Sequence, residues 1–324
     1  MAIFLVLMVV LTGTDCLYAT GYRHTVASRA ARLNRTDTVI GFTRTHIVRD
    51  NETLVGIARK YGLGFNEISI LYPTVDPWTP RTGINLSIPQ LWIVPPSAYH
   101  EIVINIPEMR LYRFFPDISM VKTYPVGIGT LDAPTPQGSY RIAECKIDPI
   151  WLIPASRRTK YRTVCIRAGL RNPLGRYWIG LSNRKYGIHG TNFPWSVGRL
   201  VSNGCIRLYP EHISQLFQEV SIGTRVEIIY EPVKLGFKNR QIYMEVHPDS
   251  YRKIKNMAAH IHTLLHSHDV ETYVSMEKLK TVLFKKDGVP TLIGTLPETY
   301  GWTGIVNSED RSSMKELFKT PERR

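Results

Sequence analysis

The chain has 324 residues, ordinary apolar content and a formal charge of +14, because Lys and Arg outnumber Asp and Glu. This length suits one large domain or two to three smaller ones, and the composition excludes wholesale disorder. The charge favours anionic surroundings, although a basic protein whose charge mainly serves solubility is an equally ordinary reading. We expect no nucleic-acid partner, because the sequence has no zinc-finger spacing, no basic heptad helix and no RNA-binding aromatic strand.

The first residues indicate export. Ala2 to Leu11 is an uninterrupted apolar run, too short to span a bilayer. Leu17-Tyr-Ala19 resembles a signal-peptidase site, so residues 1–20 are predicted to be a signal peptide, although no Lys or Arg precedes the run. Since no other segment is long and apolar enough to cross a membrane, an exported protein without a stable membrane span is expected.

The cysteines point to a free thiol. Cys16 would leave with the signal peptide, and an odd number would remain, namely Cys145, Cys165 and Cys205. In an exported protein an odd number flags a potentially reactive thiol. Pairing of Cys145 with Cys165 and two unpaired buried thiols both stay open.

Residues 21–43 are rich in Arg and Thr without a clear period, which predicts a linker. A compact unit is expected over residues 44–95, because apolar residues there follow helical spacing between two alternating runs. The elements predicted within it are a strand at 46–48, a helix whose stripe is Leu54, Ile57, Ala58 and Tyr61, with Gly62 at its end, a second helix over 66–71 with Asn66 as N-cap, and a closing strand over 84–88.

This βααβ order resembles the LysM domain, a small module that holds N-acetylated glycans. The matching stretches are His46-Ile-Val-Arg-Asp-Asn-Glu-Thr-Leu54, Ile57-Ala-Arg-Lys-Tyr-Gly62, and Tyr72-Pro-Thr-Val-Asp-Pro-Trp78 through Ile88-Pro89. Asn51 stands where glycine is usual, and Asn tolerates left-handed backbone, so the turn is expected to survive. Leu54 and Ile57 would form the core of any such unit, and glycan binding would fall on its loops.

From His100 to about Tyr230 the pattern changes to short strands separated by Gly and Pro, which predicts a mainly β domain over residues 99–230. One helix is expected from Pro210 to Val220. Residues 231–324 are predicted to form a small mixed subdomain and tail, with a strand at 241–246, a helix over 251–266 and a charged end from 308.

One segment carries chemistry. His189 is followed by Gly190, and Cys205 stands 16 positions after the His, preceded by Gly204. A thiol attacks as thiolate, and an imidazole can take its proton and return it to a leaving amine. Backbone amides at Gly204 and Cys205 are expected to face a developing oxyanion, and Arg207 suits a substrate carboxylate. A Cys and a His at this spacing are more often a buried thiol and an unrelated His than a catalytic pair. The glycines near both residues favour a site.

The same segment resembles the L,D-transpeptidase (YkuD-type) catalytic domain. The matching residues are His189-Gly190, Gly198, Ser202-Asn203-Gly204-Cys205 and Arg207, with upstream matches at Tyr124-Pro-Val-Gly-Ile-Gly129, Thr135-Pro-Gln-Gly138, Pro149 to Pro154 and Asn172-Pro-Leu-Gly175. With the LysM-like unit in front, the whole resembles Gram-negative periplasmic ErfK/YbiS-like enzymes. The fold implied is a β-sandwich-like catalytic domain preceded by a small βααβ domain, mainly β with α+β parts.

The resemblance implies specific roles. Cys205 would attack the bond between the diamino acid of a tetrapeptide stem and its terminal D-Ala, with His189 as acid and base and the Gly190 carbonyl orienting it. Ser202, Asn203 and Gly204 would shape the nucleophile loop, and Arg207, Trp195 and Gly198 would bind substrate. Asn203 replaces the usual His, which organises the loop in one reading and assists protonation in the other.

The implied partners are peptidoglycan glycan strands and peptide stems in the periplasm, and an outer-membrane lipoprotein as one candidate acyl acceptor. No cofactor or metal is expected. Two alternatives remain beside transfer to an amine: a hydrolase of the same stems, because the acceptor is set by cleft shape and water exclusion, and a glycan-binding wall protein without activity.

Overall fold

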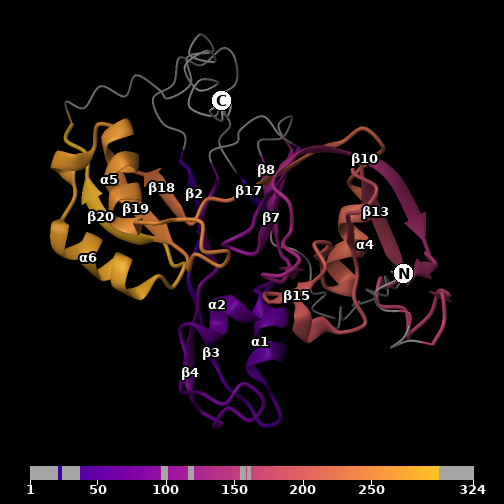
Figure 1. Ribbon diagram of the computed structural model, residues 1–324. Coiled ribbons are helices and arrows are strands. Elements are labelled where there is room, and N and C mark those ends of the chain that lie inside the picture. Colours follow the sequence, from indigo (N-terminus) through magenta and orange to yellow (C-terminus); the bar gives the residue numbers. More distant parts are fainter. Residues whose placement is uncertain are drawn as a thin grey trace, which may run out of the picture.

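The computed structural model describes residues 21–23, 37–95, 101–115, 120–153, 158 and 162–298. Residues 1–20, predicted as a signal peptide, and the charged end from 308 lie outside this part. Three bodies are visible in Figure 1: a violet N-terminal unit, a large magenta to salmon sheet region, and an orange and yellow C-terminal subdomain. None of the helices described is long and apolar enough to cross a membrane.

The largest feature is a nine-stranded sheet in the order β1-β8-β7-β6-β17-β10-β13-β14-β16. Its pairs are antiparallel except β6 with β17 and β14 with β16, which are parallel. The prediction of a mainly β chain with helices is thereby confirmed, and these nine strands form one continuous sheet. Their bounds are β1 Gly21–Arg23, β6 Ile102–Asn105, β7 Arg110–Phe115, β8 Met120–Pro125, β10 Gly138–Ile147, β13 Tyr177–Leu181, β14 Gly187–His189, β16 Ile206–Arg207 and β17 Arg225–Ile229.

Two short pairs flank the large sheet. β9 (Ile128–Gly129) pairs in parallel with β15 (Leu200–Ser202), and β11 (Trp151–Leu152) pairs antiparallel with β12 (Cys165–Ile166). The 3₁₀ helix η3 (Pro194–Ser196) lies between β14 and β15.

Both faces of the central strands are buried. In β6, Ile102 and Ile104 join a core that includes Ile213 and Leu216 of helix α4 (Pro210–Gln218). Val103, which points to the opposite face, joins a second core shared with the N-terminal unit. The second face is buried because the N-terminal unit covers it.

The N-terminal unit contains β3 (Arg44–Ile47), α1 (Leu54–Lys60), α2 (Phe65–Ser69) and β4 (Asn85–Ile88), with β3 and β4 antiparallel. Asn51 adopts a φ of 64°, as expected for the residue in place of glycine. The predicted N-cap of α2 is wrong. The cap is Gly64, whose N–H donates to Oε2 of Glu67 at 2.7 Å, because a Glu three residues on closes a capping box.

The predicted linker 21–43 also needs correction. Gly21–Arg23 forms β1, and β2 (Val39–Gly41) pairs with β5 (Leu91–Ile93). Val39 and Ile40 are both buried. Two adjacent β-branched apolar residues therefore pack as a short strand.

The C-terminal subdomain has its own core beneath a three-stranded sheet. The strand predicted at 241–246 is confirmed as β19. The helix predicted from 251 begins at Met257, because Asn256 caps it by accepting from the Ala259 N–H at 3.1 Å. The bounds are β18 Val233–Lys238, β19 Gln241–Val246, α5 Met257–Ser267, η4 Glu271–Tyr273, α6 Met276–Lys285 and β20 Thr291–Thr295.

A buried ion cluster joins this subdomain to the rest. The Lys234 ammonium donates to Glu108 Oε2 at 2.8 Å and to the Ile93 carbonyl at 2.6 Å, and lies 2.9 Å from Glu245 Oε1. His247 Nε2 is 2.5 Å from the same Glu245 oxygen. Among the described residues, Glu108, Glu245 and His247 are close enough together to share a metal ion. The Lys234 ammonium lies among them and supplies the positive charge, so we interpret the group as an ion-pair cluster.

Candidate active site

His189 ends strand β14, and Cys205 immediately precedes strand β16, which pairs with β14 in parallel. β14 and β16 pair with Ile188 opposite Ile206 and His189 opposite Arg207. Both Ile residues lie in the core, so His189 and Arg207 project from the other face. Cys205 lies two positions before Arg207, at the start of β16, and strand alternation would place it on the same face as His189.

The His189 ring is held in one tautomer. Its Nδ1 lies 2.6 Å from the Gly190 carbonyl oxygen, which can only accept, so Nδ1 carries the proton and Nε2 has the free lone pair. Trp178 stacks on the ring with centroids 5.8 Å apart. Burial, followed by the nearby Arg207 charge, lowers the pKa of His189 to about 3, against the opposing effect of the Gly190 and Leu174 carbonyls. The imidazole is therefore neutral and presents a base at Nε2.

Cys205 is a free thiol whose Sγ lies 3.8 Å from the Lys185 carbonyl oxygen. Burial raises its pKa, while the Gly187 backbone and the Arg207 guanidinium act in the lowering direction. The thiol and the imidazole are thus both neutral at rest. The thiol must lose its proton as it attacks, which requires a base.

Cys145 and Cys165 are also free thiols. The disulfide that the sequence left open is therefore not formed in this structure. Cys145 lies in β10 and Cys165 in β12, away from the β14–β16 pair.

Ser202 organises the nucleophile loop. Its Oγ donates to the Cys205 carbonyl at 2.5 Å and accepts from the Gly204 N–H at 3.1 Å. The expectation that the Gly204 amide faces an oxyanion is wrong, because this N–H is used within the loop. Gly204 has a φ of +97°, and a Cβ there would lie 2.5 Å from the Tyr186 ring. Asn203 is exposed at the tip of this loop.

Gly198 was predicted to bind substrate, and the structure places it elsewhere. It has a φ of +79°, and a Cβ on it would lie 2.3 Å from the backbone nitrogen of Phe65. The Phe65 N–H donates to the Val197 carbonyl at 3.1 Å, so the loop packs backbone to backbone against α2. Gly198 therefore joins the N-terminal unit to the catalytic sheet.

Trp195 lies in η3 and is 44% exposed, beside Phe193, which is 47% exposed. The two rings meet edge to face with centroids 5.9 Å apart. This aromatic pair follows His189 directly in the chain and is available to a ligand. Arg207 pairs with His189 across the strands and acts electrostatically on both the imidazole and the thiol.

Sequence reasoning missed two residues that shape the site. Trp178 was not among the predicted site residues, yet it stacks on His189. Gly187 was not singled out, and a Cβ on it would lie 2.6 Å from the Trp178 ring. The signal available was the position of Gly187, two residues before the His on one strand, which places it on the same face.

A third such residue, Asn172, was noted only as part of a family motif. Its side chain is buried, and its Nδ2 donates to the carbonyls of Pro149 at 2.7 Å and of Ile166 and Arg167, each at 3.3 Å. It thereby fixes the segment that ends at Gly175, whose backbone contacts Gly190.

Known proteins are similar in sequence to this chain. The family model described as the YkuD L,D-transpeptidase catalytic domain matches residues 99–228. The "Probable L,D-transpeptidase YcfS" of Escherichia coli strain K12 is 34% identical over 268 residues, covering 78% of this chain and 84% of that protein. The "Probable L,D-transpeptidase ErfK/SrfK" of Salmonella typhimurium is 34% identical over 275 residues, covering 79% and 87%. The chain therefore belongs to the L,D-transpeptidase family, cysteine enzymes that act on peptidoglycan peptide stems.

A further relative is consistent with this assignment. The "Probable L,D-transpeptidase YbiS" of Escherichia coli strain K12 is 37% identical over 206 residues, which is 61% of this chain and 67% of that protein. Within the family defined by these matches, the protein is a peptidoglycan L,D-transpeptidase.

Proposed function

We propose that Cys205 is the nucleophile and His189 the general acid and base of this transpeptidase. The observation that carries the proposal is the 2.6 Å contact from His189 Nδ1 to the Gly190 carbonyl, because it leaves Nε2 as a base on the face where Cys205 lies. Neutral Nε2 takes the thiol proton as Sγ attacks the carbonyl carbon of the diamino acid in a tetrapeptide stem.

The acyl transfer has two halves. In the first, the bond from the diamino acid carbonyl to the nitrogen of D-Ala breaks, the imidazolium returns its proton to that nitrogen, and a thioester forms on Cys205. In the second, an amine attacks the thioester, Nε2 takes the amine proton, and the thiolate leaves and is reprotonated. Ser202 holds the Cys205 carbonyl throughout, which keeps the nucleophile loop in one conformation. Arg207 would bind a substrate carboxylate, and Trp195 would offer a flat apolar face.

We also propose that the βααβ unit is a LysM module that binds the glycan strand, in an enzyme located in the periplasm. The support is the order β3-α1-α2-β4, with the turn at Asn51 and the Thr53 side chain capping α1 by accepting from the Gly56 N–H at 2.9 Å. The unit is firmly attached to the catalytic sheet. Arg59 donates to both carboxylate oxygens of Glu211 at 2.7 and 2.6 Å, and the Tyr209 hydroxyl donates to the Leu63 carbonyl at 3.0 Å.

Intact mass spectrometry after incubation with a carbapenem tests the nucleophile. We expect one drug-sized adduct on the wild type, no adduct on Cys205→Ala and a slowed reaction on His189→Ala. Cys165→Ala is the matched control, because it removes another free, half-buried thiol and should react like the wild type. An unchanged adduct on Cys205→Ala would mean that another residue is the nucleophile, and no adduct on a folded wild type would favour a glycan-binding protein without activity. Either result would contradict the assignment.

The acyl acceptor is tested next. With tetrapeptide muropeptides as donors, transfer gives a dimer cross-linked between two diamino acids, while the alternative hydrolase gives only a tripeptide. A peptide that carries a lysine side chain, offered as acceptor, would be joined to the stem if a lipoprotein is the partner. Dimer or lysine adduct formation supports transfer, whereas tripeptide alone supports hydrolysis.

A further inference from the structure

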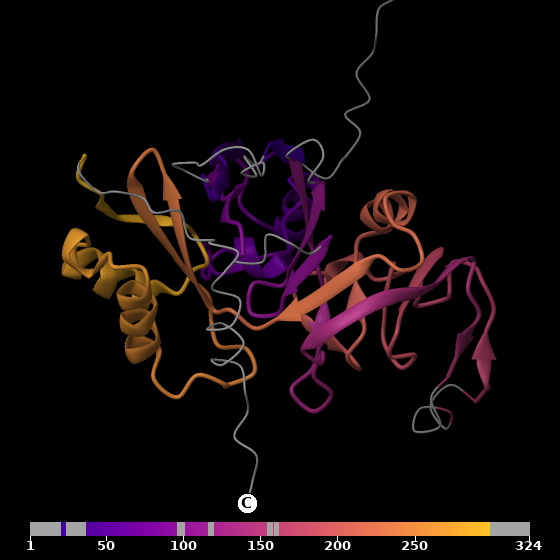
Figure 2. The same ribbon diagram turned by 90° about the horizontal axis from the view of Figure 1, so that it is seen from above.

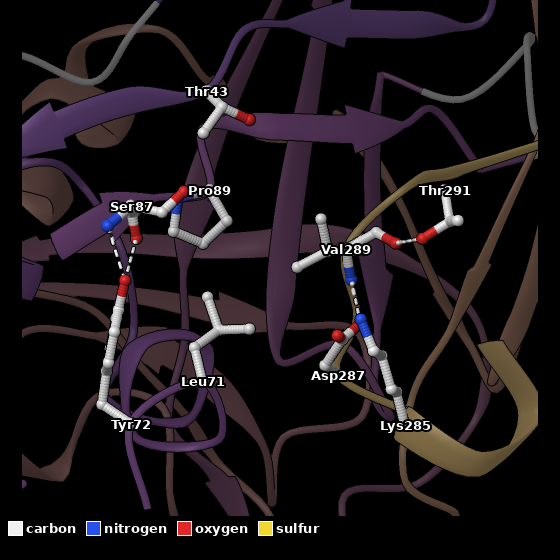
Figure 3. A pocket seen from close by; sticks show the side chains of 9 residues that line it. All are labelled: Thr43, Leu71, Tyr72, Ser87, Pro89, Lys285, Asp287, Val289 and Thr291. Carbon is white, nitrogen blue, oxygen red and sulfur yellow. Dashed lines mark hydrogen bonds between the residues drawn. The ribbon is translucent and has the colours of Figure 1, made fainter. Parts of the chain in front are cut away.

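A pocket lies between the βααβ unit and the C-terminal subdomain, with a cavity volume of about 280 Å³. Figure 3 shows side chains of the two bodies facing each other across it. Tyr72 and Ser87 line one wall, and Lys285, Asp287 and Val289 line the other. In Figures 1 and 2, β20 and α6 lie on one side of the βααβ unit and α4 and β13 on the other, so the pocket is separate from the active site.

The lining groups are held in place by their own bonds. The Tyr72 hydroxyl accepts from the Ser87 N–H at 2.5 Å and donates to the Ser87 carbonyl at 3.3 Å, which fixes its ring on β4. On the other wall, Asp287 Oδ1 accepts from the Val289 N–H at 3.1 Å. The Lys285 ammonium forms no hydrogen bond or ion pair with any residue in the described part of the chain, so it is available to a ligand.

The two walls are also fixed relative to each other. The buried Lys234 ammonium binds Glu108 and the Ile93 carbonyl, and the Ile93 N–H donates to Glu245 Oε2 at 2.7 Å. Gly236 of β18 packs so closely on Ile93 that a Cβ would lie 2.8 Å from its side chain. A pocket between walls that do not move loses little conformational entropy when it binds a ligand.

The chemistry of the lining selects the ligand. The Lys285 ammonium donates and the Asp287 carboxylate accepts, as a compact ring rich in hydroxyl groups requires. The Tyr72 ring and the Val289 side chain offer apolar surface to a ring face or a methyl group. A volume of about 280 Å³ lies near the lower limit for small-molecule sites, which suits a single sugar ring and not a folded segment.

We propose that this pocket binds an N-acetylated amino sugar of the glycan strand, and that the C-terminal subdomain exists to complete this second carbohydrate site. The inference rests on the proposed function, because that function supplies the glycan. It assigns a role to Lys285 and Asp287, which lie outside the catalytic domain and outside the βααβ unit.

Titration of the full chain with chito-tetraose, a soluble chain of four N-acetylglucosamine units, tests the proposal by calorimetry. Because the Lys285 ammonium is exposed and well solvated, loss of its hydrogen bond should count as an ordinary one, so Lys285→Ala is expected to weaken binding about three- to tenfold. Lys278→Ala is the matched control, because Lys278 is exposed on the same helix and does not line the pocket. A second variant, Ser87→Tyr, fills the pocket from an exposed strand position and should weaken binding at least as much.

Every variant should keep wild-type carbapenem acylation, so loss of glycan binding is separated from loss of the catalytic function. The proposal is overturned if the wild type does not bind the tetramer, or if Lys285→Ala and Ser87→Tyr bind it as the wild type does. It is also overturned if only Trp78→Ala, in the exposed loop before β4, removes binding. Displacement of the tetramer by a free diamino acid would assign the pocket to peptide stems and equally overturn the proposal.

Discussion

Replacing Gly198 with Ala should weaken the packing of the βααβ unit against the catalytic sheet and lower the free energy of unfolding by an amount that the structure allows us to calculate. The backbone at Gly198 has a φ of +79°, and an added Cβ would lie 2.3 Å from the Phe65 nitrogen and 2.7 Å from the Gly64 carbonyl carbon. The left-handed conformation costs about 1–2 kcal/mol for a residue with a Cβ. Forced overlap in a packed region costs about 1–3 kcal/mol more. We therefore expect the free energy of unfolding to fall by about 2–5 kcal/mol.

Gly223→Ala is the matched control, because Gly223 has a φ of +93° but no atom within 4 Å of the added Cβ. It should lose only the conformational part, about 1–2 kcal/mol. Urea unfolding of both variants measures the difference, and carbapenem acylation reports whether the active site survives. If Gly198→Ala costs no more than Gly223→Ala, the backbone contact between α2 and the catalytic loop is refuted.

The remaining predictions concern the site, the ion cluster and pH. Ser202→Ala removes both loop hydrogen bonds, so carbapenem acylation should slow at least about tenfold while Cys205 stays intact by mass; an unchanged rate would exclude Ser202 from positioning the nucleophile. Lys234→Met should lower the free energy of unfolding by about 3–5 kcal/mol, because it leaves buried carboxylates without their cation; a smaller loss in urea unfolding would show that the cluster is solvated. Burial raises the pKa of Glu231 to about 7. The folded state therefore binds this proton more tightly than the unfolded state, and stability falls as pH rises from about 4.5 to 7. Glu231→Gln should stabilise the protein at pH 8 and change little at pH 4, and equal effects at both values would contradict this. The lowered pKa of His189 makes stability depend on pH in the opposite sense. The unfolded state gains a proton below about pH 6.5, whereas the folded state gains it only near pH 3. The free energy of unfolding therefore decreases by about 1.4 kcal/mol for each unit by which the pH falls within that window. Thermal unfolding of His189→Gln should show a shallower slope there than the wild type.

The family could be predicted, and a candidate reacting pair located, because both depend on local sequence. His189 and Cys205 lie in short segments with glycines around them, and the family match confirms the class of enzyme. The strand at 241–246 and the α4 helix were predictable for a similar reason, since their apolar periodicity is complete within one segment.

The errors arose where a residue serves a contact that is distant in sequence. Gly198 was assigned to the substrate because it belongs to the motif that carries the family resemblance, yet the chain it approaches is α2, more than 130 positions earlier. Val39 and Ile40 are too few to mark a strand by periodicity, and only pairing with β5 makes them one. The Gly204 amide was misassigned because its partner, the Ser202 hydroxyl, depends on a loop conformation that no propensity describes.

The ion cluster has a consequence for the order in which the chain can mature. Glu108 is fully enclosed, and its cation, Lys234, lies 126 positions later. A chain released from its N-terminus onward exposes Glu108 and the β5 strand long before Lys234 and Glu245 have emerged. An uncompensated carboxylate resists burial, so the interface around β5 stays open during that interval. The interface around β5 can therefore fold completely only after the C-terminal third is present. A product truncated before Lys234 would keep this interface open and sensitive to proteases.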